Sequence, residues 1–185
     1  LQGAINDLGP TIIAAHVTAR KISELCMMML STLANSMATF AGQNHGAKRY
    51  DRIKTGLKKT LLFSFGIDAF LIFMIYTIGE LLVKLISDTS NPEIISNATF
   101  YLRFDLPFYF VLSIVVITRM CLQGMGAKFV PIIASLMELG IKIITAGILA
   151  KKLQYLGIAI CEPLSWTVCA VFILIIFFNQ IKKLS

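Results

Sequence analysis

Residues 60–79 read TLLFSFGIDAFLIFMIYTIG, a stretch in which Asp68 carries the only charge. An α-helix rises about 1.5 Å per residue, so a helix of this length spans the roughly 30 Å hydrocarbon core of a bilayer. Its apolar residues occupy all sides of the helix, whereas a helix on a soluble protein has one apolar stripe. The stretch therefore predicts a membrane-spanning helix over 60–79.

Similar apolar runs occur along the rest of the chain. The 185 residues are 57% hydrophobic and 15% charged, with a mean hydropathy of +0.79. A soluble domain is about a quarter charged and cannot bury this many all-round apolar helices in one core. We therefore predict an all-α, polytopic transmembrane helix bundle with five whole helices and the end of another at 1–9. The whole helices are expected at 12–41, 60–79, 93–122, 129–150 and 156–181.

The net charge of +7 comes from basic residues that gather between the apolar runs. A nucleic-acid-binding domain would place them on a folded polar face, so we expect no nucleic-acid partner. Alternate connections differ in basic content, and the richer set holds the predicted polar loop 42–59, Lys128 and the tail 182–183. The poorer set holds Lys84, Lys151 and Lys152. The positive-inside rule therefore predicts a cytoplasmic C-terminus.

One polar stripe lies on the second expected helix, where Arg20, Glu24, Ser31 and Asn35 recur at helical spacing. Ionisable groups at membrane depth are costly unless paired or hydrated, and they are functional candidates by default. One hypothesis is a polar wall that lines a central cavity. The alternative is an ion cluster near the outer interface, in which Arg20 and Lys21 neutralise Glu24 locally.

A second polar stripe lies on the helix expected at 129–150. Glu138 and Lys142 are four residues apart in the favourable order for a helical ion pair, with Ser135 and Thr145 on the same side. Two interpretations stay open at this point. The stripe either lines a cavity or proton relay, or it is a structural pair that holds the helices together.

Asp68 is a lone acid that must be protonated or find a partner on another helix. Arg119 is a candidate partner, and a role for Asp68 in binding the coupling ion is one hypothesis. Arg119 otherwise lies near the predicted cytoplasmic end, where its long side chain would extend toward water.

Proline predicts a bend in the helix expected at 93–122, because Pro107 lacks a backbone donor. The preceding Arg103 and Asp105 are interpreted as interfacial anchors. Glu162 is interpreted in the same way, and a cavity role is the alternative because Trp166 lies one turn away.

Catalytic signatures are not apparent in this sequence. The four cysteines lie within apolar runs, and neither histidine has a companion at metal-ligand spacing. No phosphate loop or nucleophile elbow is recognisable. We therefore expect no enzymatic activity, no metal site and no cofactor apart from a coupling ion.

Several short segments resemble one membrane-protein family. They are IAAH at 13–16, AGQNHGAKRYDRI at 41–53, LQGMG at 122–126, EL at 138–139 and EPLSW at 162–166. Their order and spacing resemble the second half of the multidrug and toxic compound extrusion (MATE) family, most closely its DinF-like bacterial branch. The 41–53 segment is the most specific of them.

This resemblance implies a twelve-helix protein with two six-helix lobes around a central cavity. Such proteins export cationic or amphipathic drug-like compounds by alternating access, driven by Na⁺ or H⁺. Residues 1–185 would be a partial C-terminal transmembrane lobe in a bacterial cytoplasmic (inner) membrane. Its expected partners are the lipid bilayer, a small drug-like substrate and a missing N-terminal lobe.

The candidate cavity residues are Arg20, Glu24, Asn35, Asp68, Glu138 and Lys142. The sequence departs from some family members at 111–114, which read VLSI without an acid in the middle of the corresponding helix. Coupling through this lobe would then depend on Glu24, Glu138 and Lys142.

Two other functions are compatible with the same sequence. One is a lipid-linked saccharide flippase of the wider superfamily, which would have a more basic and more hydrated cavity. The other is a non-transporting membrane assembly subunit, whose helices serve only to hold a complex together.

Overall fold

The computed structural model describes residues 9–184, apart from the side chains of residues 150–152 and 154. The helix end expected at 1–9 therefore lies almost entirely outside the described residues. The elements are α2 (Pro10–Gly46), α3 (Tyr50–Ser87), α4 (Pro92–Asp105), the 3₁₀ turn η1 (Leu106–Phe108), α5 (Tyr109–Gly124) and α6 (Phe129–Leu184). Five segments of the described chain are helical, long and apolar enough to cross a membrane. The expected all-α transmembrane bundle is thus confirmed.

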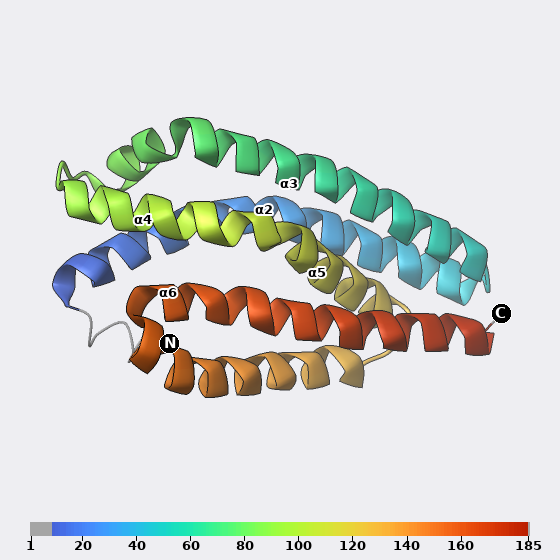
Figure 1. The fold of residues 1–185 in the computed structure, drawn as a ribbon. Helices are drawn as coiled ribbons and strands as arrows, with labels where there is room; N and C mark the ends of the chain where they lie inside the picture. Colours follow the sequence, from blue (N-terminus) through green and yellow to red (C-terminus); the bar gives the residue numbers. More distant parts are fainter. Residues whose placement is uncertain (1–8, 185) are drawn as a thin grey trace.

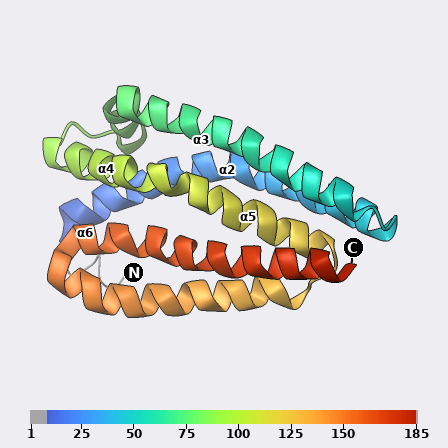
Figure 2. The same cartoon turned by 45° about the vertical axis from the view of Figure 1, so that its right-hand side comes forward.

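The helices lie roughly parallel or antiparallel in an elongated bundle (Figure 1). Helix α2 packs against α3, α4 and α5, and α5 also packs against α6. Figure 2 shows the same order from a second direction, with α3 at one edge and α6 at the other. The buried core between α2 and α5 includes Leu30, Tyr109 and Leu122.

The polar loop expected at 42–59 is wrong. Helix α2 continues to Gly46 and α3 begins at Tyr50, so the connection is only residues 47–49. Buried Ile53 and Leu57 lie one turn apart on α3, while the charged residues between and beside them are exposed. The segment is an amphipathic helical extension, because Lys and Arg are good helix formers and α3 gains an apolar face to pack.

The start of α4 and the end of α3 are set by local caps. Asp88 ends α3 in the left-handed conformation with φ 47°, and its amide donates to the Lys84 carbonyl. The Asn91 side chain accepts a hydrogen bond from the Glu93 amide, 2.9 Å away, which caps α4. Helix α3 therefore ends later than residue 79, and little of the expected connector remains.

The bend expected at Pro107 is confirmed. The chain passes from α4 into the 3₁₀ turn at Leu106 and then into α5 at Tyr109. Proline removes one backbone donor and its ring crowds the preceding turn, so the α-helical ladder is interrupted there. This bend changes the direction of the helix directly beside Asp105.

Helix α6 doubles back on itself, so its two arms lie side by side (Figures 1 and 2). The candidate membrane spans within it are Phe129–Leu149 and Tyr155–Leu184. The two arms meet where the Cys169 thiol lies 3.6 Å from the Ala134 carbonyl oxygen. The backbone remains helical through the reversal. The connection expected between the helices at 129–150 and 156–181 is therefore part of α6.

Helices α2 and α5 approach closely near their C-terminal ends. A Cβ atom added at Gly124 would clash with the backbone carbonyl of Ala38, and one added at Gly42 would lie 3.3 Å from the Gly124 oxygen. Small residues allow helix backbones to approach in this way inside a membrane. Gly124 is thus required by the helix crossing, in addition to ending α5.

We expect Gly124→Ala to lower the free energy of unfolding by about 1–3 kcal/mol, because the added methyl group overpacks a backbone contact. The measurement is the apparent unfolding midpoint of the purified protein in detergent. Gly140→Ala is the matched control, since a Cβ there meets nothing within 4 Å. Equal midpoints for the two variants would contradict the close-approach argument.

Candidate functional site

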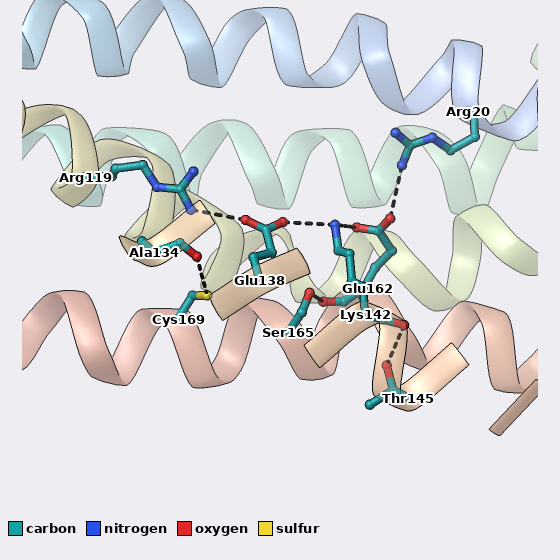
Figure 3. A network of polar contacts seen from close by, with 9 residues as sticks. All are labelled: Arg20, Arg119, Ala134, Glu138, Lys142, Thr145, Glu162, Ser165 and Cys169. Carbon is teal, nitrogen blue, oxygen red and sulfur yellow. Dashed lines mark hydrogen bonds and ion pairs between the residues drawn. The ribbon is translucent and has the colours of Figure 1, made fainter. Parts of the chain in front are cut away.

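Five charged side chains form an alternating chain of ion pairs across the bundle (Figure 3). Arg20 lies 3.5 Å from Glu162, and Glu162 lies 2.9 Å from Lys142. Lys142 also lies 2.9 Å from Glu138, and Glu138 lies 3.2 Å from Arg119. Each carboxylate therefore contacts two cations, and Lys142 contacts two carboxylates. We call these five residues the ion-pair chain.

The ion-pair chain connects three helices. Arg20 comes from α2, Arg119 from α5, and the remaining three residues from the two arms of α6. Glu138 and Lys142 meet because residues four apart lie on one helical face. Glu162 is brought to them by the reversal of α6, and only its side-chain tip is reached by Arg20 from α2.

Burial makes this arrangement energetically important. The Glu162 side chain is 10% exposed, and those of Glu138 and Lys142 are 21% exposed. Removing one partner from a buried ion pair leaves an uncompensated charge, and this costs more than the intact pair contributes. Arg20, at 42% exposed, is the most accessible member.

The ion-pair chain lines a cavity of about 220 Å³. Other polar groups in its wall are Glu24, Asp105 and Ser23, and its apolar wall includes Met27, Leu112 and Trp166. The Tyr109 ring packs edge-on against Trp166 with ring centroids 5.9 Å apart. Among the described residues, three cationic and four acidic side chains face this space.

Two of the four acids lie outside the ion-pair chain. Glu24 is exposed at the cavity wall, and the alternative in which Arg20 pairs with Glu24 is wrong, since Arg20 reaches Glu162 instead. Asp105 is only 1% exposed, and its Oδ1 atom has no hydrogen-bond partner in the described part of the chain. These two carboxylates are the ones free to accept a ligand.

Asn35 and Asp68 lie away from this cavity. Asn35 is exposed on α2, and its carbonyl accepts a hydrogen bond from Thr39. Asp68 is buried between α3 and α5, where the Ser113 hydroxyl donates to Oδ2 at 2.7 Å. The expected partner Arg119 binds Glu138 instead, because it lies on the face of α5 that meets α6. Of the six candidate cavity residues, the structure therefore brings four to this cavity, namely Arg20, Glu24, Glu138 and Lys142.

Glu162 and Asp105 lie at the cavity, where the sequence did not predict them. Both were expected as interfacial anchors, yet both are buried and face the cavity. The Arg103 side chain goes elsewhere, 3.9 Å from Glu80 on α3. The available signal was an acid beside a proline in an apolar run, since such a residue at membrane depth is a functional candidate by default.

The described residues contain no group of three or more His, Cys, Asp or Glu side chains that could hold a metal ion. Glu138 and Glu162 already contact cations, so neither presents a free oxygen cage. The cavity is suited to binding a charged small molecule or a single monovalent ion at Asp105 or Glu24.

We expect Lys142→Met to cost about 3–5 kcal/mol of unfolding free energy, because it leaves Glu138 and Glu162 facing each other without their shared cation. Lys21→Met is the matched control, since Lys21 is exposed on α2. Chemical denaturation of both variants in detergent is the measurement. A Lys142→Met protein as stable as the control would contradict the structural importance of the ion-pair chain.

Comparison with known proteins agrees with the fold. The family model described as MatE matches residues 3–148. A relative, "Probable multidrug resistance protein YoeA" of Bacillus subtilis (strain 168), is 23% identical over 167 residues. The match covers 89% of this chain and 36% of the relative, so the chain spans little more than a third of that protein's length.

Solved structures give the same result at the level of fold. A MATE protein in the bent conformation superposes with a TM-score of 0.86 at 18% identity, over 95% of this chain and 39% of that one. An outward-facing multidrug resistance MATE family transporter superposes with a TM-score of 0.81 at 19% identity, over 92% and 38%. An inward-facing one superposes with 0.81 at 17% identity, over 94% and 40%.

The expected resemblance to the MATE family, carried most specifically by segment 41–53, is therefore confirmed at the level of the family. The family model covers well over half of the chain, and the five spans reproduce the helical bundle of the solved MATE structures. This multi-pass membrane protein belongs to the MatE family.

Proposed function

We propose that this chain forms part of a cation-coupled antiporter that exports small amphipathic or cationic compounds by alternating access. The family supports this proposal, as does the name of the B. subtilis relative, a probable multidrug resistance protein. The observation that carries it is the cavity beside the ion-pair chain. Ionisable groups within membrane-spanning helices are costly even when paired, so a cluster of them beside a cavity is a functional candidate by default.

Charge and shape at the cavity favour a cationic or amphipathic substrate. The acids outnumber the cations by one, and in the described part of the chain neither Glu24 nor Asp105 lies within ion-pair distance of a cation. Trp166, Tyr109 and the pliable Met27 supply an apolar and aromatic wall, which suits varied ring-containing cations. The cavity of about 220 Å³ is smaller than a usual ligand site of roughly 300–1,000 Å³. The complementary lobe would complete it.

A coupling ion acts only if it binds one conformation better than the other. We assign this role to Asp105 and Glu24, each of which can accept H⁺ or Na⁺. A cation bound there would compete with the neighbouring positive charges for the acidic groups, and the accessible Arg20–Glu162 contact would be the first to rearrange. That contact joins α2 to the C-terminal arm of α6. Its loss would permit these helices to move relative to one another.

The proposal includes a location and a partner. The protein would lie in a bacterial cytoplasmic membrane with its C-terminus inside, as the distribution of basic residues predicts. The N-terminal lobe of the same protein would provide the opposite wall of the cavity. Substrate would enter from one side of the membrane and the ion from the other.

We expect Asp105→Asn in the full-length protein to reduce the export of a fluorescent cationic drug at least tenfold, since the neutral amide can neither take up H⁺ nor supply the negative charge that attracts Na⁺. Proteoliposomes with an imposed Na⁺ gradient or an imposed pH gradient separate the two coupling ions. Glu93→Gln is the matched control, because Glu93 is an exposed acid on the same α4. Unchanged export by a correctly folded Asp105→Asn protein would refute the coupling role.

The two alternatives give different results in the same assay. A lipid-linked saccharide flippase would translocate a fluorescent saccharide lipid and leave the cationic drug in place. An assembly subunit would tolerate the neutralisation of Glu24 and Glu138 without any change in export by its complex. We expect Glu24→Gln with Glu138→Gln to reduce drug export at least tenfold, and retention of full export would support the subunit function instead.

A further inference from the structure

A long groove between α2 and α3 lies apart from the cavity. Its first section has a volume of about 690 Å³ and is lined by residues such as Phe40, Arg52, Thr55 and Lys59. Its second section has a volume of about 560 Å³ and is lined by Met29, Phe63, Gly66 and Phe70. Lys59 lines both sections, so they form one continuous surface.

The two sections differ in chemistry. Near the 47–49 connection the groove presents the cations of Arg52 and Lys59, both exposed. In the described structure neither cation lies within ion-pair distance of a carboxylate. Asp51 also lines this section, and its carboxylate lies 3.5 Å from Lys54. Beyond Lys59 the wall is apolar, and Leu62, Phe63 and Phe70 are all more than 60% exposed.

The length of the apolar section matches one leaflet of a bilayer. Lys59 and Phe70 are eleven residues apart on α3, or about 16 Å at 1.5 Å per residue. Half of the roughly 30 Å hydrocarbon core is about 15 Å. A cationic end followed by an apolar channel of this length has the dimensions of a phospholipid with its headgroup and one acyl chain.

We propose that this α2–α3 groove binds an anionic glycerophospholipid. Its phosphate lies between Arg52 and Lys59, and an acyl chain runs past Phe63 and Gly66 toward Phe70. Basic pockets between membrane helices on the cytoplasmic side are suited to such headgroups. The predicted topology places this end of α3 at the cytoplasmic leaflet, where anionic lipids bind most readily to basic residues.

The first test removes the charge of the headgroup site. Each basic residue near an anionic lipid contributes about a factor of five in affinity, so R52Q with K59Q is expected to weaken phosphatidylglycerol binding about 25-fold. R49Q with K58Q is the matched control, since it removes one exposed arginine and one exposed lysine of the same region outside the groove. Native mass spectrometry of the full-length protein with phosphatidylglycerol or phosphatidylcholine gives the affinities.

The second test fills the acyl channel. A Cβ at Gly66 meets nothing within 4 Å, so Gly66→Leu should fold normally and obstruct the groove. We expect Gly66→Leu to weaken phosphatidylglycerol binding at least fivefold. In a separate measurement without an acyl chain, we expect glycerol 3-phosphate and inorganic phosphate to bind no better to the wild type than to R52Q/K59Q. Gly140→Leu, at another open glycine, should leave phosphatidylglycerol binding unchanged.

Three results would overturn the proposal. Equal losses in the two double variants would mean a diffuse charge effect. Binding of inorganic phosphate as strong as that of the lipid would mean an anion site without a lipid. Failure of photoreactive phosphatidylglycerol to label the groove in membranes would mean that another part of the protein covers it.

Discussion

Glu162 links α2 and the two arms of α6 at the cavity. Its carboxylate contacts Lys142 on the other arm of α6 at 2.9 Å and Arg20 on α2 at 3.5 Å. Through Lys142 this link extends to Glu138, and then to Arg119 on α5. The orientation of α6 relative to α2 and α5 thus depends on a set of charges that must be neutralised together, because all of them except Arg20 are largely buried.

Such a network is an unusual way to stabilise a membrane bundle. Packed apolar side chains of similar volume are often at least as stabilising as buried ion pairs, and small residues already allow close packing where Gly124 meets α2. An ion-pair chain differs from apolar packing because each of its charged groups can exchange one oppositely charged partner for another. A cation that arrives at a neighbouring carboxylate changes the balance of the whole chain, which is how a bound ion can shift a conformational equilibrium.

Helix α2 contributes to both the cavity and the α2–α3 groove, with different parts of its length. Its N-terminal part presents Arg20, Glu24 and Met27 to the cavity. Its C-terminal part presents Leu33 and Phe40 to the groove shared with α3. Movement of α2 would therefore alter both surfaces, so lipid bound in the proposed groove would favour whichever conformation of the cavity accompanies it. The reciprocity follows from linkage between binding and conformation.

The class of this protein and most of its helices can be predicted from its residues alone. Runs such as 60–79 can satisfy their backbone hydrogen bonds in lipid only as helices, and Pro107 must interrupt a helical ladder wherever it occurs. The pair Glu138–Lys142 was equally predictable, because four residues of one helix set its geometry. The length of α3 was not, since packing of Ile53 and Leu57 decides whether a charged segment continues a helix.

Which charges meet depends on how the helices pack in three dimensions. Arg20 could pair with Glu24 on its own helix, and Asp68 could have attracted Arg119, yet they contact Glu162 and Ser113 respectively. Glu162 and Asp105 gained their importance from the reversal of α6 and the bend at Pro107, which turn both acids inward. Local spacing fixes contacts within a helix, whereas contacts between helices depend on how each helix is rotated and bent against its neighbours.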